Sequence, residues 1–359
     1  MQWLIKQCEE FTQKIYRVRS DTMPEKWEKV KISDIAKIKY GKDHKKLEDG
    51  NIPVYGTGGI MRYVDTSLYS KKSVLIPRKG SLGNLFFVKE PFWTVDTLFY
   101  TEIDESRIMP EYLYYKLKTY DLANMNVGSA VPSLTTAILN PIELELPDLE
   151  TQAEIVKTLG AIDEKIENNK KINHHLAEMA ESIWKEKYAN LKPNSTLGNF
   201  FPIITGKKDA NVARGGQYPF FSCSQGISYT DAYSFEGNAI LLAGNGDFNV
   251  KTYNGKFEAY QRTYVLIPNN EYRLGFLYYA IKHFLSDITA GDRGSVIKYI
   301  TKGDIENLNL YMPDDESDFE LFNQFVSNTA QNNAEIERLT ETRDTLLPKL
   351  MSGELSVID

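Results

Sequence analysis

The side chains that most often carry out catalysis are few in this chain and are not grouped. Its cysteines and histidines are scattered along the sequence: Cys8, His44, His174, His175, Cys223 and His283. His174 and His175 fall inside a long helical pattern, which favours a solvated helix face over a metal site. The cysteine spacing does not suit zinc. We therefore predict no catalytic residues, no metal site and no cofactor bound by the chain itself.

Two glycine-containing stretches resemble nucleotide-binding loops but lack their full pattern. Thr205-Gly206-Lys207-Lys208 matches the end of a phosphate-binding loop, without the earlier glycine. Gly56-Thr57-Gly58-Gly59 does not open a long helix, as a dinucleotide-binding fingerprint would. Carboxylates are plentiful, but no spacing in the sequence marks two of them as a catalytic pair. An enzyme that acts on DNA in its own right therefore stays open only as a minor alternative.

Basic and polar residues in glycine turns suggest contact with DNA. Arginine suits guanine, asparagine and glutamine suit adenine, and lysine mostly contacts phosphate. Arg78-Lys79-Gly80-Ser81 is the strongest candidate, because it places two cations and a hydroxyl on a turn whose glycine permits close approach. Its counterpart, 243–249, carries amides instead, so we expect the two loops to read different sequences. The predicted DNA-binding residues are Tyr55, Thr57, Arg62, Arg78, Lys79, Ser81, Asn84, Lys207, Lys208, Gln225, Asn245, Asp247, Asn249, Arg262, Arg293 and Lys298.

A solvated surface role is the alternative for each of these residues taken singly. The order of predicted strands, turns and helices around these residues indicates that they belong to common domains. Residues 23–147 alternate short strands with glycine turns and end in a short helix and strand, which is typical of a mixed α+β domain. Residues 1–22 form a separate helical segment in this interpretation.

Residues 191–313 repeat the order of residues 23–147. Phe221 matches Tyr55, Leu277-Tyr278-Tyr279 matches Leu113-Tyr114-Tyr115, and Gly294-Ser295 matches Gly128-Ser129, all at an offset of about 165 positions. We therefore predict two repeated α+β domains, each presenting its own set of glycine loops.

A long helix is predicted after each domain, at 148–190 and within 314–359. Apolar residues recur alternately at four and three positions, which is the seam of a coiled coil. The first helix would be roughly 55 Å long at about 1.5 Å per residue. We expect the two helices to pack as an antiparallel coiled coil that holds two reading domains apart. The residues expected in helix packing or partner contact are Leu149, Ile155, Ile162, Ile166, Leu176, Trp184, Ile336, Leu346, Leu347 and Leu350.

Composition sets few further limits. The net charge of −7 is a whole-chain average, whereas DNA binding requires only a basic face. No apolar run approaches the roughly 20 residues that span a bilayer, and charges interrupt the first apolar residues, so no signal peptide is predicted. Two distant cysteines indicate a reducing compartment. We expect a cytoplasmic protein without membrane contact.

The sequence resembles the specificity subunit of type I restriction–modification systems. The residues that carry the resemblance are 146–156 (LPDLETQAEIV), 162–166 (IDEKI) and 343–355 (RDTLLPKLMSGEL). The resemblance implies two target-recognition domains that read the halves of a bipartite double-stranded DNA site, with the long helices as a ruler. It also implies methylation subunits that bind S-adenosylmethionine and methylate adenine, a restriction subunit, and no catalysis by the chain itself. A two-headed scaffold that binds protein rather than DNA is the main alternative.

Overall fold

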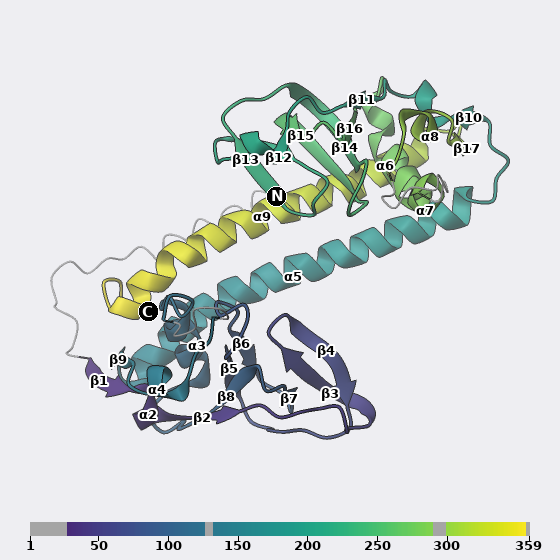
Figure 1. Cartoon of the computed structure of the whole chain (residues 1–359). Coiled ribbons are helices and arrows are strands. Elements are labelled where there is room, and N and C mark those ends of the chain that lie inside the picture. Colours follow the sequence, from purple (N-terminus) through teal and green to yellow (C-terminus); the bar gives the residue numbers. More distant parts are fainter. Residues whose placement is uncertain (1–26, 126–131, 290–298, 357–359) are drawn as a thin grey trace. The chain divides into compact units, whose positions relative to one another are not determined.

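The computed structural model describes residues 27–125, 132–289 and 299–356 (Figure 1). The chain divides into two compact units, Met1–Lys165 with Arg338–Asp359, and Ile166–Glu337. The helical segment predicted for 1–22, the glycine–serine match at 128–129 and 294–295, and the candidates Arg293 and Lys298 lie outside the described residues. Within the described helices, none is long and apolar enough to cross a membrane.

The first unit contains a four-stranded sheet of order β2-β8-β5-β6, a separate three-stranded sheet of order β4-β3-β7, and the pair β1-β9 (Figure 1). The central strand β5 is buried along its whole length, as its run of apolar residues requires. The elements before the long helix are β1 (Glu28–Lys31), α2 (Ile32–Ile35), β2 (Ala36–Tyr40), β3 (Asp49–Gly56), β4 (Gly59–Val64), β5 (Ser73–Pro77), β6 (Phe86–Val88), β7 (Trp93–Thr94), β8 (Leu98–Ile103), α3 (Pro110–Lys118), α4 (Thr136–Leu139) and β9 (Glu143–Leu146).

The second unit contains a six-stranded sheet of order β11-β16-β14-β15-β12-β13 and the pair β10-β17. Helix α6 packs against β14 and β15, as α3 packs against β5 and β6 in the first unit. The elements are β10 (Ser195–Thr196), η1 (Leu197–Asn199), β11 (Ile204–Thr205), η2 (Ala210–Val212), β12 (Tyr218–Phe221), β13 (Ile227–Thr230), β14 (Phe235–Ala243), β15 (Val250–Ala259), β16 (Thr263–Leu266), η3 (Glu271–Arg273), α6 (Leu274–His283), α7 (Leu285–Thr289), α8 (Lys302–Glu306) and β17 (Asn309–Leu310).

The strand registers confirm the predicted repeat. Tyr40 of β2 pairs with Phe99 of β8, and Thr205 of β11 pairs with Tyr264 of β16 in the same antiparallel way. Pro77 of β5 pairs with β8 as Ala243 of β14 pairs with β16. The second unit differs in one respect: the single strand β15 takes the places of β6 and β7, so two sheets become one.

Helices α5 (Leu149–Tyr188) and α9 (Ser317–Ser352) follow the repeats. The carboxylate of Asp148 accepts a hydrogen bond from the Thr151 backbone N–H at 2.8 Å and caps α5. The predicted seam of α5 is buried at Ile155, Ile162 and Ile166. Leu149, which we expected in helix packing or partner contact, is 42% exposed and does not pack in a core.

Within the second unit the two helices run antiparallel, because their contacts advance in opposite directions. Asn169 donates to the Glu335 carboxylate at 2.8 Å, and Asn332 donates to Asn173 at 2.8 Å. Farther along α5, Lys187 contacts Asp318 at 2.9 Å. Polar residues thus occupy part of the seam, where hydrogen bonding favours one register over neighbouring ones.

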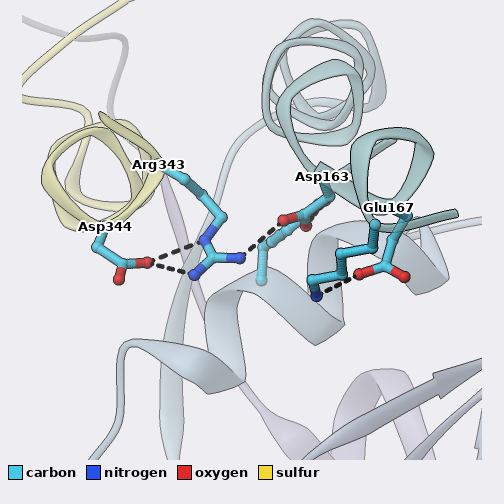
Figure 2. Close-up of polar contacts among 6 residues, drawn as sticks. Asp163, Glu167, Arg343 and Asp344 are labelled. Atoms are coloured by element: carbon cyan, nitrogen blue, oxygen red, sulfur yellow. Dashed lines mark hydrogen bonds and ion pairs between the residues drawn. The ribbon is translucent and has the colours of Figure 1, made fainter. Parts of the chain in front are cut away.

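Within the first unit an ion pair joins α5 to the end of α9. The Asp163 carboxylate accepts from Arg343 Nη1 at 2.9 Å and from the Tyr115 hydroxyl of α3 at 2.7 Å. Figure 2 shows Arg343 between Asp163 and Asp344 of its own helix. Near the last turn of α9, buried Lys116 donates to the Met351 carbonyl at 2.6 Å. These contacts tie α3, α5 and the end of α9 together within the first unit.

Candidate DNA-reading faces

Two loops of the first unit are joined by a hydrogen bond from a side chain of one to the backbone of the other. The turn at 57–58 joins β3 to β4, and the loop at 78–85 joins β5 to β6. Asn84 Nδ2 of the second loop donates to the Thr57 carbonyl of the first at 3.1 Å. Leu82 is buried and anchors the loop, while Lys79 and Ser81 beside it are exposed. The exposed pair is therefore presented on a fixed support.

Arg78 occupies a different position from its two exposed neighbours. Its guanidinium carbon lies 5.2 Å from the ring centre of Tyr40, and Nη1 donates to the Asp96 carbonyl at 3.2 Å. Arg78 is half-buried. Stacking on an aromatic face leaves the remaining N–H groups at the edge of the guanidinium free to contact an anion. Arg78 thus supplies a positioned cation beside the exposed loop.

The same two loops are joined in the second unit by side chains. Gln225 Nε2, in the loop at 222–226, donates to Asp247 Oδ2, in the loop at 244–249, at 3.1 Å. Gly246 at φ +68° matches Gly80 at φ +83°, so both loops turn through a conformation that favours glycine. Gln225 and Asp247 are exposed. This pair presents amide and carboxylate groups where the first unit presents a cation and a hydroxyl.

Asn249 supports this face from beneath and does not lie on it. Only 8% of the residue is exposed. Its Nδ2 donates to the Cys223 carbonyl at 2.9 Å and to the Asp247 carbonyl at 2.5 Å, and its Oδ1 accepts from Lys251 Nζ at 2.7 Å. Burial lowers the pKa of Lys251, which also donates to the Ser224 carbonyl. These contacts show that Asn249 positions the loop, and its predicted contact with DNA stays a prediction.

Tyr55 and Arg62 are also held in the structure of the first unit. Tyr55 is half-buried, and its ring packs near Phe86 and Phe92. Burial raises the pKa of its hydroxyl. Arg62 forms an ion pair with Asp49 at 2.6 Å and donates to the Leu47 carbonyl at 3.2 Å. Both contacts account for these residues within the fold, so their predicted DNA contacts receive no support from the geometry.

The remaining candidates of the second unit lie at two places. Asn245, in the loop at 244–249, forms a β-bridge to Tyr299. Arg262 lies next to the same loop, because its carbonyl accepts from Gly244 N at 2.8 Å. Lys207 and Lys208 are exposed; Lys207 Nζ lies 5.1 Å from the ring centre of Phe235. Among the described residues, no group of histidines, cysteines and carboxylates could hold a metal ion.

The organisation of the chain matches one family twice. The model for the type I restriction modification DNA specificity domain matches residues 24–178 and again residues 192–341. The chain belongs to this family. The two matches fall on the two repeats that the strand registers define, so the chain carries two recognition domains, as type I specificity subunits do.

Curated relatives carry the same description. The chain is 38% identical over 168 residues to the type I restriction enzyme EcoDI specificity subunit of Escherichia coli. This aligned stretch covers 45% of this chain and 38% of that protein. It is 22% identical over 413 residues to the MjaIX specificity subunit of Methanocaldococcus jannaschii, covering 93% of this chain and 95% of that protein.

A solved structure shares the fold. The type I restriction–modification S subunit from M. genitalium matches with a TM-score of 0.64 at 19% identity, over 94% of this chain and 98% of that one. The repeat of α+β domain and long helix is therefore the fold of a solved specificity subunit.

Sequence reasoning missed several residues on the recognition domains. A hollow of about 470 Å³ in the second domain is lined by Thr205, Gly244, Gln261, Arg262, Tyr264, Tyr299, Ile300, Thr301 and Lys302. Only Arg262 was predicted among them. Tyr40, which carries Arg78 in the first domain, was also missed. The repeat itself could have found them, since Thr205 and Tyr40 occupy equivalent register positions.

Proposed function

We propose that this specificity subunit reads a bipartite DNA site, one half with each recognition domain. The observation that carries the proposal is the repeated reading face: the same two loops, joined in both domains, with different chemistry exposed on them. Lys79 and Ser81 of the first domain offer donors, whereas Gln225 and Asp247 of the second offer an amide and an acceptor carboxylate. Base edges in the major groove differ in donor and acceptor pattern. Two unlike faces therefore select two unlike half-sites.

The difference in charge supports a specific division of sequence preference. Donors on the first face suit the O6 and N7 acceptors of guanine. The Asp247 carboxylate suits the amino group of cytosine, and the Gln225 amide suits adenine. Because Gln225 and Asp247 hold each other in place, they would act as one recognition unit and lose specificity together.

The chemistry on DNA would belong to partner subunits. The chain's proposed role is to bring methylation subunits, which would carry S-adenosylmethionine, to adenines of the site, and to direct a restriction subunit in the same complex. The proposal includes no catalysis by this chain and places it in the cytoplasm, where DNA and these partners meet.

Long-read detection of modified adenine tests the proposal. DNA is compared from cells that carry this chain with its methylation subunit and from cells that lack only this chain. We expect a split motif that disappears without the chain. A continuous short motif would mean that one domain reads DNA. No change, together with no salt-dependent DNA binding by the purified complex, would favour a protein-binding scaffold instead.

A further inference from the structure

The hollow of the second domain lies beside the reading loop and carries positive charge at its rim. Its walls come from β11, from the start of the 244–249 loop, from β16 and the two residues before it, and from residues 299–302. Arg262 and Lys302 are exposed. Lys302 Nζ lies 3.2 Å from the Glu306 carboxylate, with both side chains largely exposed. The Arg262 guanidinium makes no hydrogen bond or ion pair with other residues in the described part of the chain.

The equivalent place in the first domain is filled by a side chain. Arg78 corresponds to Gly244, because Arg78 N donates to the Thr97 carbonyl as Gly244 N donates to the Arg262 carbonyl, each at 2.8 Å. Tyr40, on which Arg78 stacks, corresponds to Thr205. The second domain thus has a glycine and a threonine where the first has an arginine and a tyrosine, and the space they leave is the hollow.

The positive charge at this place is kept although its source changes. Arg262 stands at the position of Thr97, since their carbonyls accept equivalent hydrogen bonds. Lys302 stands at the position of Thr136: each is the first residue of a short helix, and the bridges Lys79–Ser133 and Asn245–Tyr299 align the segments before those helices. The first domain therefore carries one cation here, Arg78, on the loop after β5. The second carries two, Arg262 and Lys302, on other segments that line the hollow.

A contact to a base edge depends on the placement of particular atoms, whereas a contact to phosphate needs charge and reach. Retained charge on altered side chains is the pattern expected for phosphate. We propose that the hollow binds a backbone phosphate of the DNA, held by Arg262 and Lys302, and that Arg78 binds the corresponding phosphate in the first domain. This inference rests on the proposed function and gives these three residues an anchoring role separate from sequence reading.

The geometry of Gly244 explains why the second domain cannot use the arrangement of the first. A Cβ at this position would lie 2.5 Å from the Arg262 carbonyl oxygen and 3.0 Å from the Tyr264 ring. A side chain there would have to displace backbone. The cations consequently approach from residues 262 and 302, and Thr205 and Gln261 add a hydroxyl and an amide that can donate to phosphate oxygens.

The test is the salt dependence of binding to a duplex that lacks the recognition site, measured on the full chain with its methylation subunit. The logarithm of the binding constant falls with the logarithm of salt concentration by about 0.9 per phosphate neutralised. Arg262→Gln with Lys302→Gln should reduce this slope by about 0.9. Arg78→Gln should reduce it by a similar amount. The matched control is Lys192→Gln, an exposed cation of the second unit, which should leave the slope unchanged.

Two further measurements distinguish a loss of phosphate binding from unfolding and from a loss of base recognition. Arg262→Lys should retain the wild-type slope, because phosphate needs only the charge; thermal unfolding of each variant should match wild type. The inference is overturned if the double variant keeps the wild-type slope. It is also overturned if the double variant lowers the slope but changes the methylated motif as well, because phosphate anchoring carries no sequence preference. A wild-type complex without any salt dependence would instead contradict the proposed function itself.

Discussion

Asn249→Ala should loosen the second reading face without unfolding its domain. The substitution removes three hydrogen bonds, two donated to the carbonyls of Cys223 and Asp247 and one accepted from Lys251. At roughly 1 kcal/mol for each bond, the local opening free energy of the two loops should fall by about 3 kcal/mol. Amide hydrogen exchange at 222–226 and 244–249 should therefore become about 100-fold faster.

The matched control is Asn254→Ala, at an exposed asparagine of β15, the strand that follows the loop. Exchange in the two loops should be unchanged in this variant. We also expect the methylated motif of Asn249→Ala to become degenerate at the second half-site and to stay intact at the first. Unchanged exchange in Asn249→Ala, or equal loss at both half-sites, would refute the reasoning that Asn249 positions one reading loop.

Three more predictions concern the helices. Asp163→Asn should lower the free energy of unfolding by about 1–2 kcal/mol in urea titrations, because Arg343 and Tyr115 lose a shared carboxylate. The control is Glu167→Gln (Figure 2), which should cost less than about 0.5 kcal/mol because the ion pair of Glu167 with Lys170 is largely exposed. The hydrogen bond from Tyr188, with that from Lys187, lowers the pKa of Asp318. The stabilisation is therefore present above the ordinary pKa of an aspartate and is lost as pH falls through the lowered value. Wild type should exceed Asp318→Asn in stability at pH 7 and lose that advantage in acid, whereas an advantage that persists under acid would count against this pairing; exposed Asp314→Asn is the control. Deleting seven residues from each long helix, about two turns, should change the gap between half-sites in the methylated motif, and an unchanged gap would show that these helices do not set it.

The repeat and the helix seams were accessible from sequence because both are written in local patterns. The matched order of strands and glycines predicted that 243–249 is the counterpart of the loop that begins at Arg78. The four-and-three spacing placed Ile155, Ile162 and Ile166 on a buried face. These features depend on periodicity and order, which survive the substitution of individual residues.

The roles of single loop residues could not be deduced in the same way. Asn249 is held in a buried position in part by the Cys223 carbonyl, which lies 26 positions away in the sequence. Tyr55 belongs to an aromatic cluster that forms only when β3 pairs with β7. Lys302 reaches the hollow through a bridge between loops far apart in sequence. Composition showed which residues could contact DNA, but tertiary contacts decide which of them are exposed.

The most direct test of the central claim is a comparison of modified-adenine maps for two double variants. Lys79→Ala with Ser81→Ala alters the exposed residues of the first reading loop, and Gln225→Ala with Asp247→Ala alters those of the second. We expect the first variant to relax one half of a split motif and the second to relax the other half, with the gap preserved in both. Relaxation of the same half by both variants, or of both halves by either, would contradict a division of the site between two recognition domains.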